Sequence, residues 1–239
     1  MSDLAALLAD PFVVRDRRIA IDLPGGQACF TTARDGSLAP GDPDAARVAE
    51  RLAQAIGIPV ERWAQDNQVH GAHVRVAATA EALRPMSADA DGQATALREV
   101  ACVVRVADCL PIALIAPEGV AALHGGWRSL AAGIVDVGVA ALHRLGASEI
   151  RAAIGPGAGV CCYQAGAEVH AALAPLGAGV RRGDHADLLA AARALLVRAG
   201  VDEIHAAGIC TICADPELLY SHRRDHGATG RQALIAWRS

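Results

Sequence analysis

Three residues of this chain have the types and positions that metal or nucleophilic chemistry requires: His70, Cys109 and His124. Each follows an apolar residue and precedes glycine, or leucine and proline, as is typical where a β-strand ends. Two imidazoles and one thiolate suit a catalytic zinc ion, because the fourth coordination position stays free for water or substrate. The three residues lie far apart in the sequence, so only the fold can bring them together.

The same residues have other interpretations. Cys109 could be a nucleophile with His124 as its base, as in a hydrolase. A cysteine and two histidines would also bind Cu(II) at least as tightly as Zn(II). Each residue alone could equally be an ordinary small core thiol or a hydrogen-bonded histidine. The residue types alone leave these alternatives open.

Four further cysteines form two local pairs, Cys161-Cys162 and Cys210-x-x-Cys213. The second pair has the spacing of a redox motif, but no helix is expected to begin directly after it and lower a thiol pKa. A disulfide between sequence neighbours would be strained, and a second C-x-x-C for a zinc ribbon is absent. Both pairs are therefore interpreted as structural.

The composition restricts the class of protein. The chain has 239 residues, 53% of them hydrophobic and 20% charged, as is typical of a globular protein. A net charge of −4 argues against binding to nucleic acid or an anionic membrane surface. No signal peptide or membrane-spanning run is evident, and an odd number of cysteines in mostly apolar segments indicates reduced thiols. We expect a cytoplasmic monomer with no nucleic-acid or membrane partner.

The expected elements alternate between strands and helices. In the central stretch, a buried strand ends at Asp108-Cys109, a second apolar strand follows, and a third delivers His124 to a Gly125-Gly126 corner. A helix with an apolar face should then run from about residue 127 to 145. Other strands are expected at 19–32 (a hairpin), 62–69, 150–154, 204–210 and 232–237, other helices at 45–56, 165–174 and 186–199, and a linker at 81–86.

No linker long enough to separate independent domains is evident. We therefore expect one domain over residues 1–239, of the α+β class, with mixed β-sheets covered by helices. Two segments that each follow an expected helix, at 145–155 and 199–209, resemble each other. They could be a duplicated helix–strand unit or ordinary alanine-rich patterning.

A series of short blocks resembles the YfiH-type laccase-domain family, also described as multicopper polyphenol oxidase-like or purine nucleoside phosphorylase. The blocks occur in the family's order between about residues 28 and 237. They are Gln68-Val69-His70-Gly71, Ala90-Asp91-Gly92, Ala107-Asp108-Cys109-Leu110-Pro111, His124-Gly125-Gly126-Trp127-Arg128, Ile154-Gly155-Pro156, Cys162-Tyr163, Cys210-Thr211, Ser221-His222-Arg223-Arg224-Asp225 and Thr229-Gly230-Arg231.

The resemblance implies a layered α/β/β/α fold of the YfiH/CNF1-like type. It also implies that His70, Cys109 and His124 bind one Zn²⁺, with Cu²⁺ as the possible alternative. The implied activity is phosphorolysis of adenosine, inosine, guanosine and methylthioadenosine, with deamination of adenosine. The alternatives are a copper-dependent polyphenol oxidase and a Cys–His hydrolase linked to cell-wall precursor editing. The expected partners are purine nucleosides and phosphate.

Further roles can be assigned around this site. Asp108 or Asp91 could move a proton during deamination. Arg128, at an expected helix N-terminus beside free backbone N–H groups, could hold phosphate, and other arginines could add positive charge. The sequence departs from the family pattern at several positions, and none of the departures removes a metal ligand. These positions are Val106, Gly157, Gln164 and His222.

Overall fold

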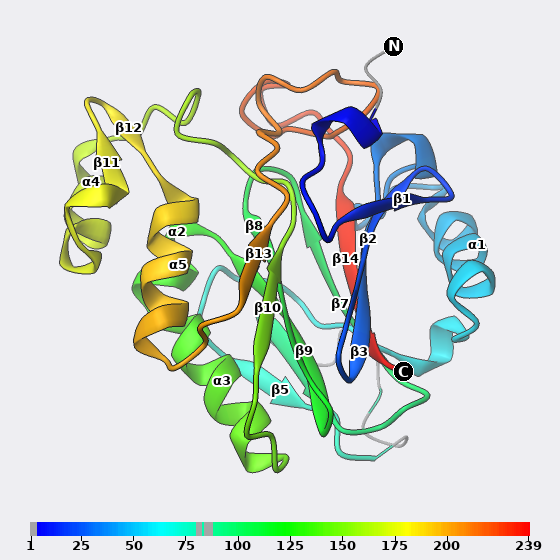
Figure 1. Ribbon diagram of the computed structural model, residues 1–239. Coiled ribbons are helices and arrows are strands. Elements are labelled where there is room, and N and C mark those ends of the chain that lie inside the picture. Colours follow the sequence, from blue (N-terminus) through cyan, green and yellow to red (C-terminus); the bar gives the residue numbers. More distant parts are fainter. Residues whose placement is uncertain (1–3, 80–82, 84–87) are drawn as a thin grey trace.

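Two six-stranded β-sheets lie face to face, and helices cover both outer faces (Figure 1). The computed structural model describes residues 4–79, 83 and 88–239. The expected linker at 81–86 therefore lies, apart from Leu83, outside the described residues. The mixed sheets and covering helices confirm the predicted α+β fold.

The first sheet has the order β1-β2-β3-β14-β7-β4. Its strands are β1 (Val13–Arg15), β2 (Arg18–Leu23), β3 (Gly26–Phe30), β14 (Gln232–Arg238), β7 (Ala101–Val106) and β4 (Trp63–Ala64). All neighbours are antiparallel except β4 and β7. The C-terminal strand β14 thus pairs with strands from both the beginning and the middle of the chain.

The second sheet has the order β13-β10-β8-β9-β6-β5. Its strands are β13 (Ile204–Ala206), β10 (Arg151–Ile154), β8 (Leu110–Ala116), β9 (Gly119–Gly125), β6 (Gly92–Thr95) and β5 (Val74–Val76). The pairs β10–β13 and β5–β6 are parallel and the other pairs antiparallel. A separate small pair joins β11 (Arg181–Arg182) to β12 (His185–Ala186).

Both faces of the central strands are buried, which explains their continuous apolar sequence. Every residue of β8 and β9 is buried. One face of these strands packs against the first sheet, through residues such as Phe30, Ile115 and Leu234. The other face packs against the helices through residues such as Leu114 and Leu123. The second sheet therefore lies between the first sheet and the helices, at the centre of the molecule.

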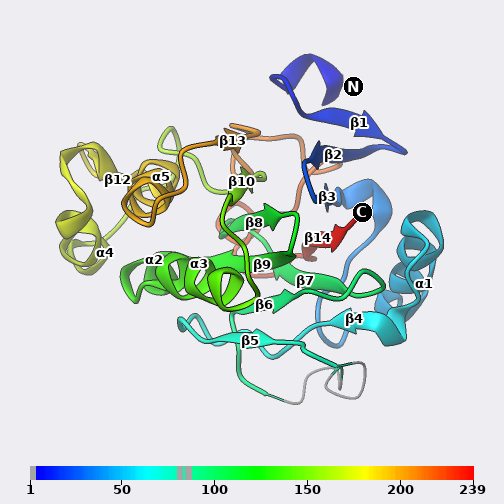
Figure 2. The same cartoon turned by 60° about the horizontal axis from the view of Figure 1, so that its bottom comes forward.

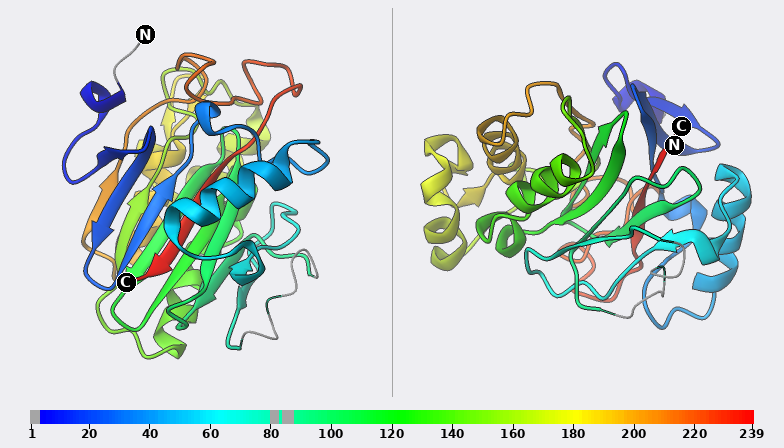
Figure 3. Two further views of the ribbon diagram at one scale, coloured as in Figure 1. Left: turned by 90° about the vertical axis from the view of Figure 1, so that its right-hand side faces the viewer. Right: turned by 90° about the horizontal axis from the view of Figure 1, so that it is seen from below.

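The helices form the two outer layers (Figures 2 and 3). Helix α1 (Ala45–Ile56) packs on the first sheet through Val48 and Leu52. Helices α2 (Trp127–Ala131), α3 (Ile134–Arg144) and α5 (Leu188–Arg198) pack on the second sheet, and α4 (Ala167–Leu173) contacts α2. Short 3₁₀ segments complete the chain: η1 (Leu4–Leu7), η2 (Ala33–Asp35), η3 (Val60–Arg62), η5 (Ala174–Leu176) and η6 (Ala178–Val180).

Three expected elements differ from the structure. The helix expected from 127 to 145 is divided into α2 and α3 at Gly133, whose φ of 86° is left-handed and cannot continue a helix. The strand expected at 62–69 is reduced to β4, and irregular backbone leads from there to His70. The helix expected at 186–199 begins at Leu188 as α5, because Asp187 caps it by accepting the Ala190 N–H at 2.9 Å.

The two similar segments of the sequence occupy equivalent places. The first follows α3 and forms β10, and the second follows α5 and forms β13. These strands are parallel neighbours, with Ala152 paired to Ile204. No helix in the described part of the chain combines the length and apolar composition that crossing a bilayer would need.

Candidate metal centre

The fold brings His70, Cys109 and His124 together. Their ligand atoms all lie within 4.8 Å of one another, and Cys109 Sγ is 3.9 Å from His70 Nε2. Cys109 ends the connection from β7 to β8, His124 belongs to β9, and His70 lies in the loop between β4 and β5. His124 is buried and His70 is exposed, so the site opens to solvent on the His70 side.

The donor set fits a divalent cation. Zn–N distances of about 2.0–2.1 Å and Zn–S distances of about 2.3 Å place tetrahedral ligand atoms between about 3.3 and 3.8 Å apart. The 3.9 Å between Cys109 and His70 is close to that range. Three protein ligands also leave one tetrahedral position for a substrate or water. The role of these residues as metal ligands remains a prediction.

Asp91 is the residue that assembles the site. Its carboxylate accepts backbone N–H groups from Val69 (3.1 Å), His70 (2.8 Å) and Gly71 (2.7 Å), and it contacts His124 Nδ1 at 2.8 Å. Its backbone carbonyl accepts the His124 N–H at 2.7 Å. One buried carboxylate thus fixes the His70 loop and orients the His124 ring, with Nε2 left free for a metal.

The loop that carries His70 is held in a conformation that is unusual for a residue with a side chain. His70 has φ of 61°, in the left-handed region that costs free energy outside glycine. Gln68 anchors the start of this loop, because its side chain accepts the Arg105 N–H at 2.8 Å and donates to the Arg105 carbonyl at 2.7 Å. Strain at His70 is therefore balanced by hydrogen bonds to Asp91 and β7.

Gly126 leaves room for the ligands to approach one another. A Cβ atom there would lie 3.1 Å from both Cys109 Sγ and His70 Cδ2. Real Cβ contacts are rarely this short, so a larger residue would push the two ligands apart. Gly126 precedes α2, and its lack of a side chain is what lets the helix begin directly beside the ligands.

Asp108 is also left-handed, with φ of 85°, and it is buried beside Cys109. Its Oδ1 accepts the Thr211 hydroxyl at 2.6 Å, and its Oδ2 accepts the Arg223 N–H at 2.7 Å. The Asp108 backbone carbonyl accepts the Ala158 N–H at 2.7 Å. These bonds place Asp108 where three loops meet and fix the direction in which Cys109 leaves the strand.

The three residues are electrostatically coupled. Burial alone would raise the pKa of the Cys109 thiol, but the charge and hydrogen bonds of His124 and His70 lower this pKa to about 6. Burial would lower the pKa of His124, but the Cys109 thiolate and the Asp91 carboxylate raise it to about 9. Cys109 is therefore a thiolate near neutral pH, which is the form that binds metals.

Tyr163 lies near Cys109, and two arginines lie near Tyr163. Burial and the charge of Cys109 raise the pKa of Tyr163, while Arg223 and Arg128 oppose this effect, so all four lie in one electrostatic neighbourhood. The Arg223 guanidinium lies over the Tyr163 ring at 5.1 Å and donates to the Gln164 carbonyl at 2.7 Å. Arg128 is exposed and stacks over the Trp127 ring at 4.2 Å.

The other two arginines considered from the sequence have structural contacts. Arg224 donates to the carbonyls of Thr211, Ala214 and Leu219 and forms an ion pair with Asp225. Arg231 donates to the carbonyls of Thr229 and Gly230. Arg128 and Arg223 therefore remain the arginines best placed to meet an anion.

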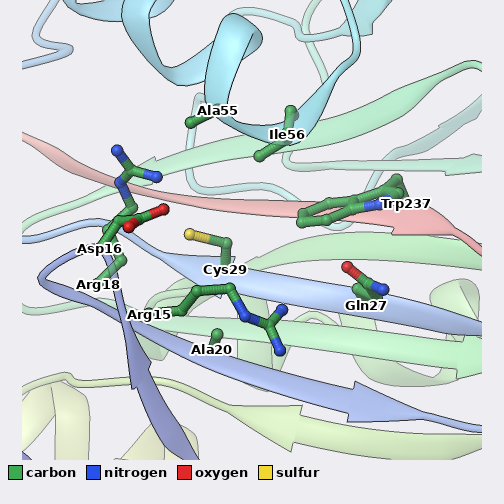
Figure 4. A pocket seen from close by; sticks show the side chains of 9 residues that line it. All are labelled: Arg15, Asp16, Arg18, Ala20, Gln27, Cys29, Ala55, Ile56 and Trp237. Carbon is green, nitrogen blue, oxygen red and sulfur yellow. The ribbon is translucent and has the colours of Figure 1, made fainter.

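The cavity in Figure 4 lies elsewhere in the molecule. It has a volume of about 110 Å³ and is lined by residues of β1 to β3, the end of α1 and Trp237. Ligand pockets for drug-sized molecules usually have about 300–1,000 Å³. This cavity is too small for a nucleoside, and none of the predicted site residues lines it.

Sequence reasoning had considered Asp91 for proton transfer but had not recognised it as the organiser of the site. The role of Gln68 was also missed. Both residues stood in the short blocks next to candidate ligands, which was the available signal. Their roles depend on hydrogen bonds between strands, and residue spacing does not reveal such bonds.

Curated relatives share substantial sequence with this chain. A protein of Xylella fastidiosa (strain Temecula1) named "Purine nucleoside phosphorylase" is 37% identical over 90% of this chain and 93% of its own length. A Deinococcus radiodurans protein with the same name is 38% identical over 77% of this chain and 74% of its own length.

Solved structures share the fold. YlmD from Geobacillus stearothermophilus superposes with a TM-score of 0.86 at 31% identity, covering 96% of this chain and 99% of that one. The Neisseria meningitidis protein NMB0706 gives a TM-score of 0.80 at 30% identity, covering 94% and 100%. The family described as multi-copper polyphenol oxidoreductase laccase matches residues 36–239. The chain belongs to this laccase-domain family, as its sequence blocks and layered sheets indicated.

Proposed function

We propose that this protein is a zinc-dependent purine nucleoside phosphorylase that also deaminates adenosine. Its substrates are adenosine, inosine, guanosine, methylthioadenosine and phosphate. The observation that carries the proposal is the three-ligand cluster of His70, Cys109 and His124, which is open on the His70 side. The names of the curated relatives support the choice of nucleosides and phosphate.

A bound zinc ion would supply Lewis acidity and lower the pKa of water. The protein's own residues perform the remaining tasks. Asp91 orients His124, and each of its carboxylate oxygens already takes part in two hydrogen bonds, which leaves no lone pair free for a further proton. Proton transfer during deamination falls instead to Asp108, which adjoins Cys109 and whose oxygens keep further lone pairs. Asp91 is accordingly a positioning residue.

Phosphorolysis requires phosphate to replace the purine at C1 of the ribose. The charges of Arg128 and Arg223 both reach the neighbourhood of Cys109 and Tyr163. One guanidinium group can bind two phosphate oxygens at the same time, which would hold the anion and orient it. Helix α2 has only five residues, so we assign the phosphate to the side chains rather than to the helix terminus.

The central test is a panel of nucleosides incubated with zinc-loaded protein, with and without phosphate. Chromatography should show free base and ribose 1-phosphate only when phosphate is present, and inosine from adenosine in either case. No product from any nucleoside would reject the proposal and favour a binding or regulatory role.

Arg128→Ala tests the phosphate assignment. The change should raise the KM for phosphate by roughly 10-fold, equivalent to the loss of one charge-assisted hydrogen bond of about 1.4 kcal/mol. Deamination of adenosine needs no phosphate and should keep its rate. Arg144→Ala removes an exposed arginine from the end of α3 and serves as the matched control. An unchanged KM for phosphate in Arg128→Ala would show that Arg128 does not bind phosphate.

A copper-dependent polyphenol oxidase is the second candidate, because the family's description names that activity. The described residues contain two groups that could hold a metal, the three-ligand cluster and a group of four cysteines. Neither group resembles the paired His-x-His motifs of oxidases with several coppers. Oxidation of a phenol by copper-loaded protein at a rate exceeding nucleoside turnover by zinc-loaded protein would favour the oxidase.

A Cys–His hydrolase would use Cys109 and His124 without a metal. His70 separates this alternative from a metal enzyme, since a two-residue dyad does not need it. If His70→Ala lost its zinc and kept its activity, the dyad would be favoured.

A further inference from the structure

The two cysteine pairs that the sequence places far apart meet in the structure. Cys161 and Cys162 follow β10, and Cys210 and Cys213 follow β13. Because β10 and β13 are parallel neighbours, both loops leave the same end of the second sheet (Figure 1). The pairing continues beyond the strands, with a bridge between Gly157 and Cys210. The two pairs, interpreted from the sequence as structural, therefore form one cluster.

All four sulfur atoms lie within 4.8 Å of one another, and Cys161 Sγ is 3.9 Å from Cys213 Sγ. Four thiolates around one zinc ion at about 2.3 Å would be about 3.8 Å apart. A disulfide needs its two sulfurs about 2.05 Å apart. The measured separation matches the edge of a zinc–sulfur tetrahedron and is far longer than a disulfide bond.

The backbone of both loops is folded around this point. After Gly159, a tight turn directs the neighbouring cysteines to the cluster, with the Cys162 and Tyr163 N–H groups bonded to the Gly159 carbonyl at 3.0 and 2.9 Å. The Ala214 N–H bonds to the Cys210 carbonyl at 3.1 Å and closes the second turn. Each loop thus contributes two thiols from a hydrogen-bonded turn.

Gly159 makes a further contribution to this geometry. Its N–H donates to Cys210 Sγ at 3.2 Å, a bond that orients and stabilises a thiolate ligand. A Cβ atom at this position would lie 2.9 Å from Cys210 Cβ and 3.2 Å from Cys161 Sγ. Any side chain here would therefore displace the sulfurs, so the glycine keeps the four thiols close together.

Core packing does not explain these thiols. Cys29 and Cys102 are the packing cysteines of this chain, with 5% and 0% of their surface exposed. Cys161 and Cys213 are exposed instead. The Arg224 guanidinium, which pairs with Asp225, donates to the Thr211 and Ala214 carbonyls and so fixes the second turn in place.

We propose that Cys161, Cys162, Cys210 and Cys213 form a second zinc site, which is closed and structural and joins the loops after β10 and β13. Four thiolates favour zinc over hard divalent cations such as Mg²⁺ and Ca²⁺, and a tetrahedral four-sulfur site is typical of zinc. With every tetrahedral position filled by protein, the site holds no substrate. The proposal does not depend on the enzymatic activity assigned to the three-ligand cluster.

Zinc counting tests the proposal on the full chain. The protein is produced in zinc-supplemented medium, dialysed extensively and measured by inductively coupled plasma mass spectrometry. We expect two zinc ions per chain in the wild type, one in His70→Ala and none in His70→Ala combined with Cys213→Ser. Cys29→Ala should keep two and controls for the loss of a thiol. If His70→Ala bound the same number of zinc ions per chain with and without Cys213→Ser, the proposed four-cysteine site would be wrong.

A second measurement avoids the risk that Cys213→Ser fails to fold. In His70→Ala protein, titration with an organomercurial should release one zinc ion as four thiols react, as followed with a colorimetric zinc indicator. Cobalt substitution of the same protein should give the intense thiolate-to-metal absorption of a four-sulfur site. Disulfides among these cysteines in a non-reducing peptide map of freshly isolated protein would overturn the proposal. Iron in place of zinc would overturn the choice of metal.

Discussion

The three-ligand cluster and the four-cysteine cluster are built from the same second sheet in opposite ways. His70, Cys109 and His124 come from three separate segments, and a buried carboxylate, Asp91, holds two of them. The four cysteines come from two hydrogen-bonded turns, and the backbone N–H of Gly159 donates to the Cys210 thiol.

This difference indicates two purposes. Mixed nitrogen and sulfur ligands with one side open suit reaction chemistry, whereas four thiols that enclose a point suit the joining of loops. The three-ligand cluster costs conformational free energy to assemble, because it requires left-handed backbone at His70 and Asp108. The second cluster requires only the parallel pairing of β10 and β13 and two turns.

His70→Ala, in the three-ligand cluster, should have the largest effect on activity. Loss of an exposed ligand should abolish nucleoside turnover, reducing it by more than the roughly 100-fold typical of an outer-shell change. The fold should survive, because the His70 side chain is exposed. His73→Ala removes a neighbouring exposed histidine whose ring contacts the Asp89 carbonyl, and it should stay active. Equal activity of the two variants would show that the reaction does not require His70.

Asp91→Asn should have the next largest effect, because it weakens the support of the ligands without removing one. We expect zinc affinity and kcat/KM to fall by roughly 10–100-fold. The amide group can accept fewer of the Val69, His70 and Gly71 N–H bonds, so stability should fall by about 1–3 kcal/mol. Competition with a chelating dye and thermal unfolding measure the two effects.

Asp89→Asn is the control for Asp91, since Asp89 is exposed and bonds to the Asn67 side chain at 2.8 Å. This variant should keep the zinc affinity and the thermal stability of the wild type. If Asp91→Asn bound zinc as tightly as the wild type, then the carboxylate would support the fold alone and not the metal.

Gly126→Ala should have a smaller effect that arises from crowding. The new methyl group would lie 3.1 Å from Cys109 Sγ and His70 Cδ2, so the ligands must separate by a few tenths of an ångström. We expect zinc affinity to fall about 10-fold, equivalent to about 1.4 kcal/mol. Gly166→Ala is matched to it, since Gly166 also precedes a helix and its Cβ would meet nothing within 4 Å. Equal zinc affinity in both variants would mean that the site has more room than the structure shows.

The sequence predicted the layered fold and the residues of the first cluster better than it predicted their support. The central strands were recognised because both their faces are buried, which leaves a continuous apolar pattern. The break between α2 and α3 was missed because Gly133 interrupts a run that keeps its apolar spacing. The spacing of apolar residues indicates which face of a helix is buried. A left-handed residue such as Gly133 changes the direction of the chain without changing that spacing.

The second cluster was not recognised from the sequence for a different reason. The separation of Cys162 from Cys210 in the chain gives no sign that β10 and β13 are neighbours. The similarity of residues 145–155 to residues 199–209 was the available clue, because repeated helix–strand units often lie side by side. Following it would have placed the loops after both strands, and so all four cysteines, at one end of the sheet.

Thr211 connects the two clusters and is the site of the smallest expected effect. It lies between Cys210 and Cys213 in the sequence, and its buried hydroxyl donates to Asp108 Oδ1 at 2.6 Å, directly before Cys109. Thr211→Val keeps the shape of the side chain and removes this bond. Bonds to charged groups contribute about 1.5–3 kcal/mol, so thermal stability should fall while zinc remains at two ions per chain.

The effect of Thr211→Val on activity decides whether the clusters are coupled. If the four-cysteine cluster positions Asp108, then kcat should fall several-fold with little change in the KM for nucleoside. Thr95→Val is the comparison, because the buried Thr95 hydroxyl donates to the Ala77 carbonyl at 2.8 Å, away from both clusters. If both variants lose stability and neither loses kcat, the two clusters act independently, and the cysteines hold the loops together without influencing the reaction.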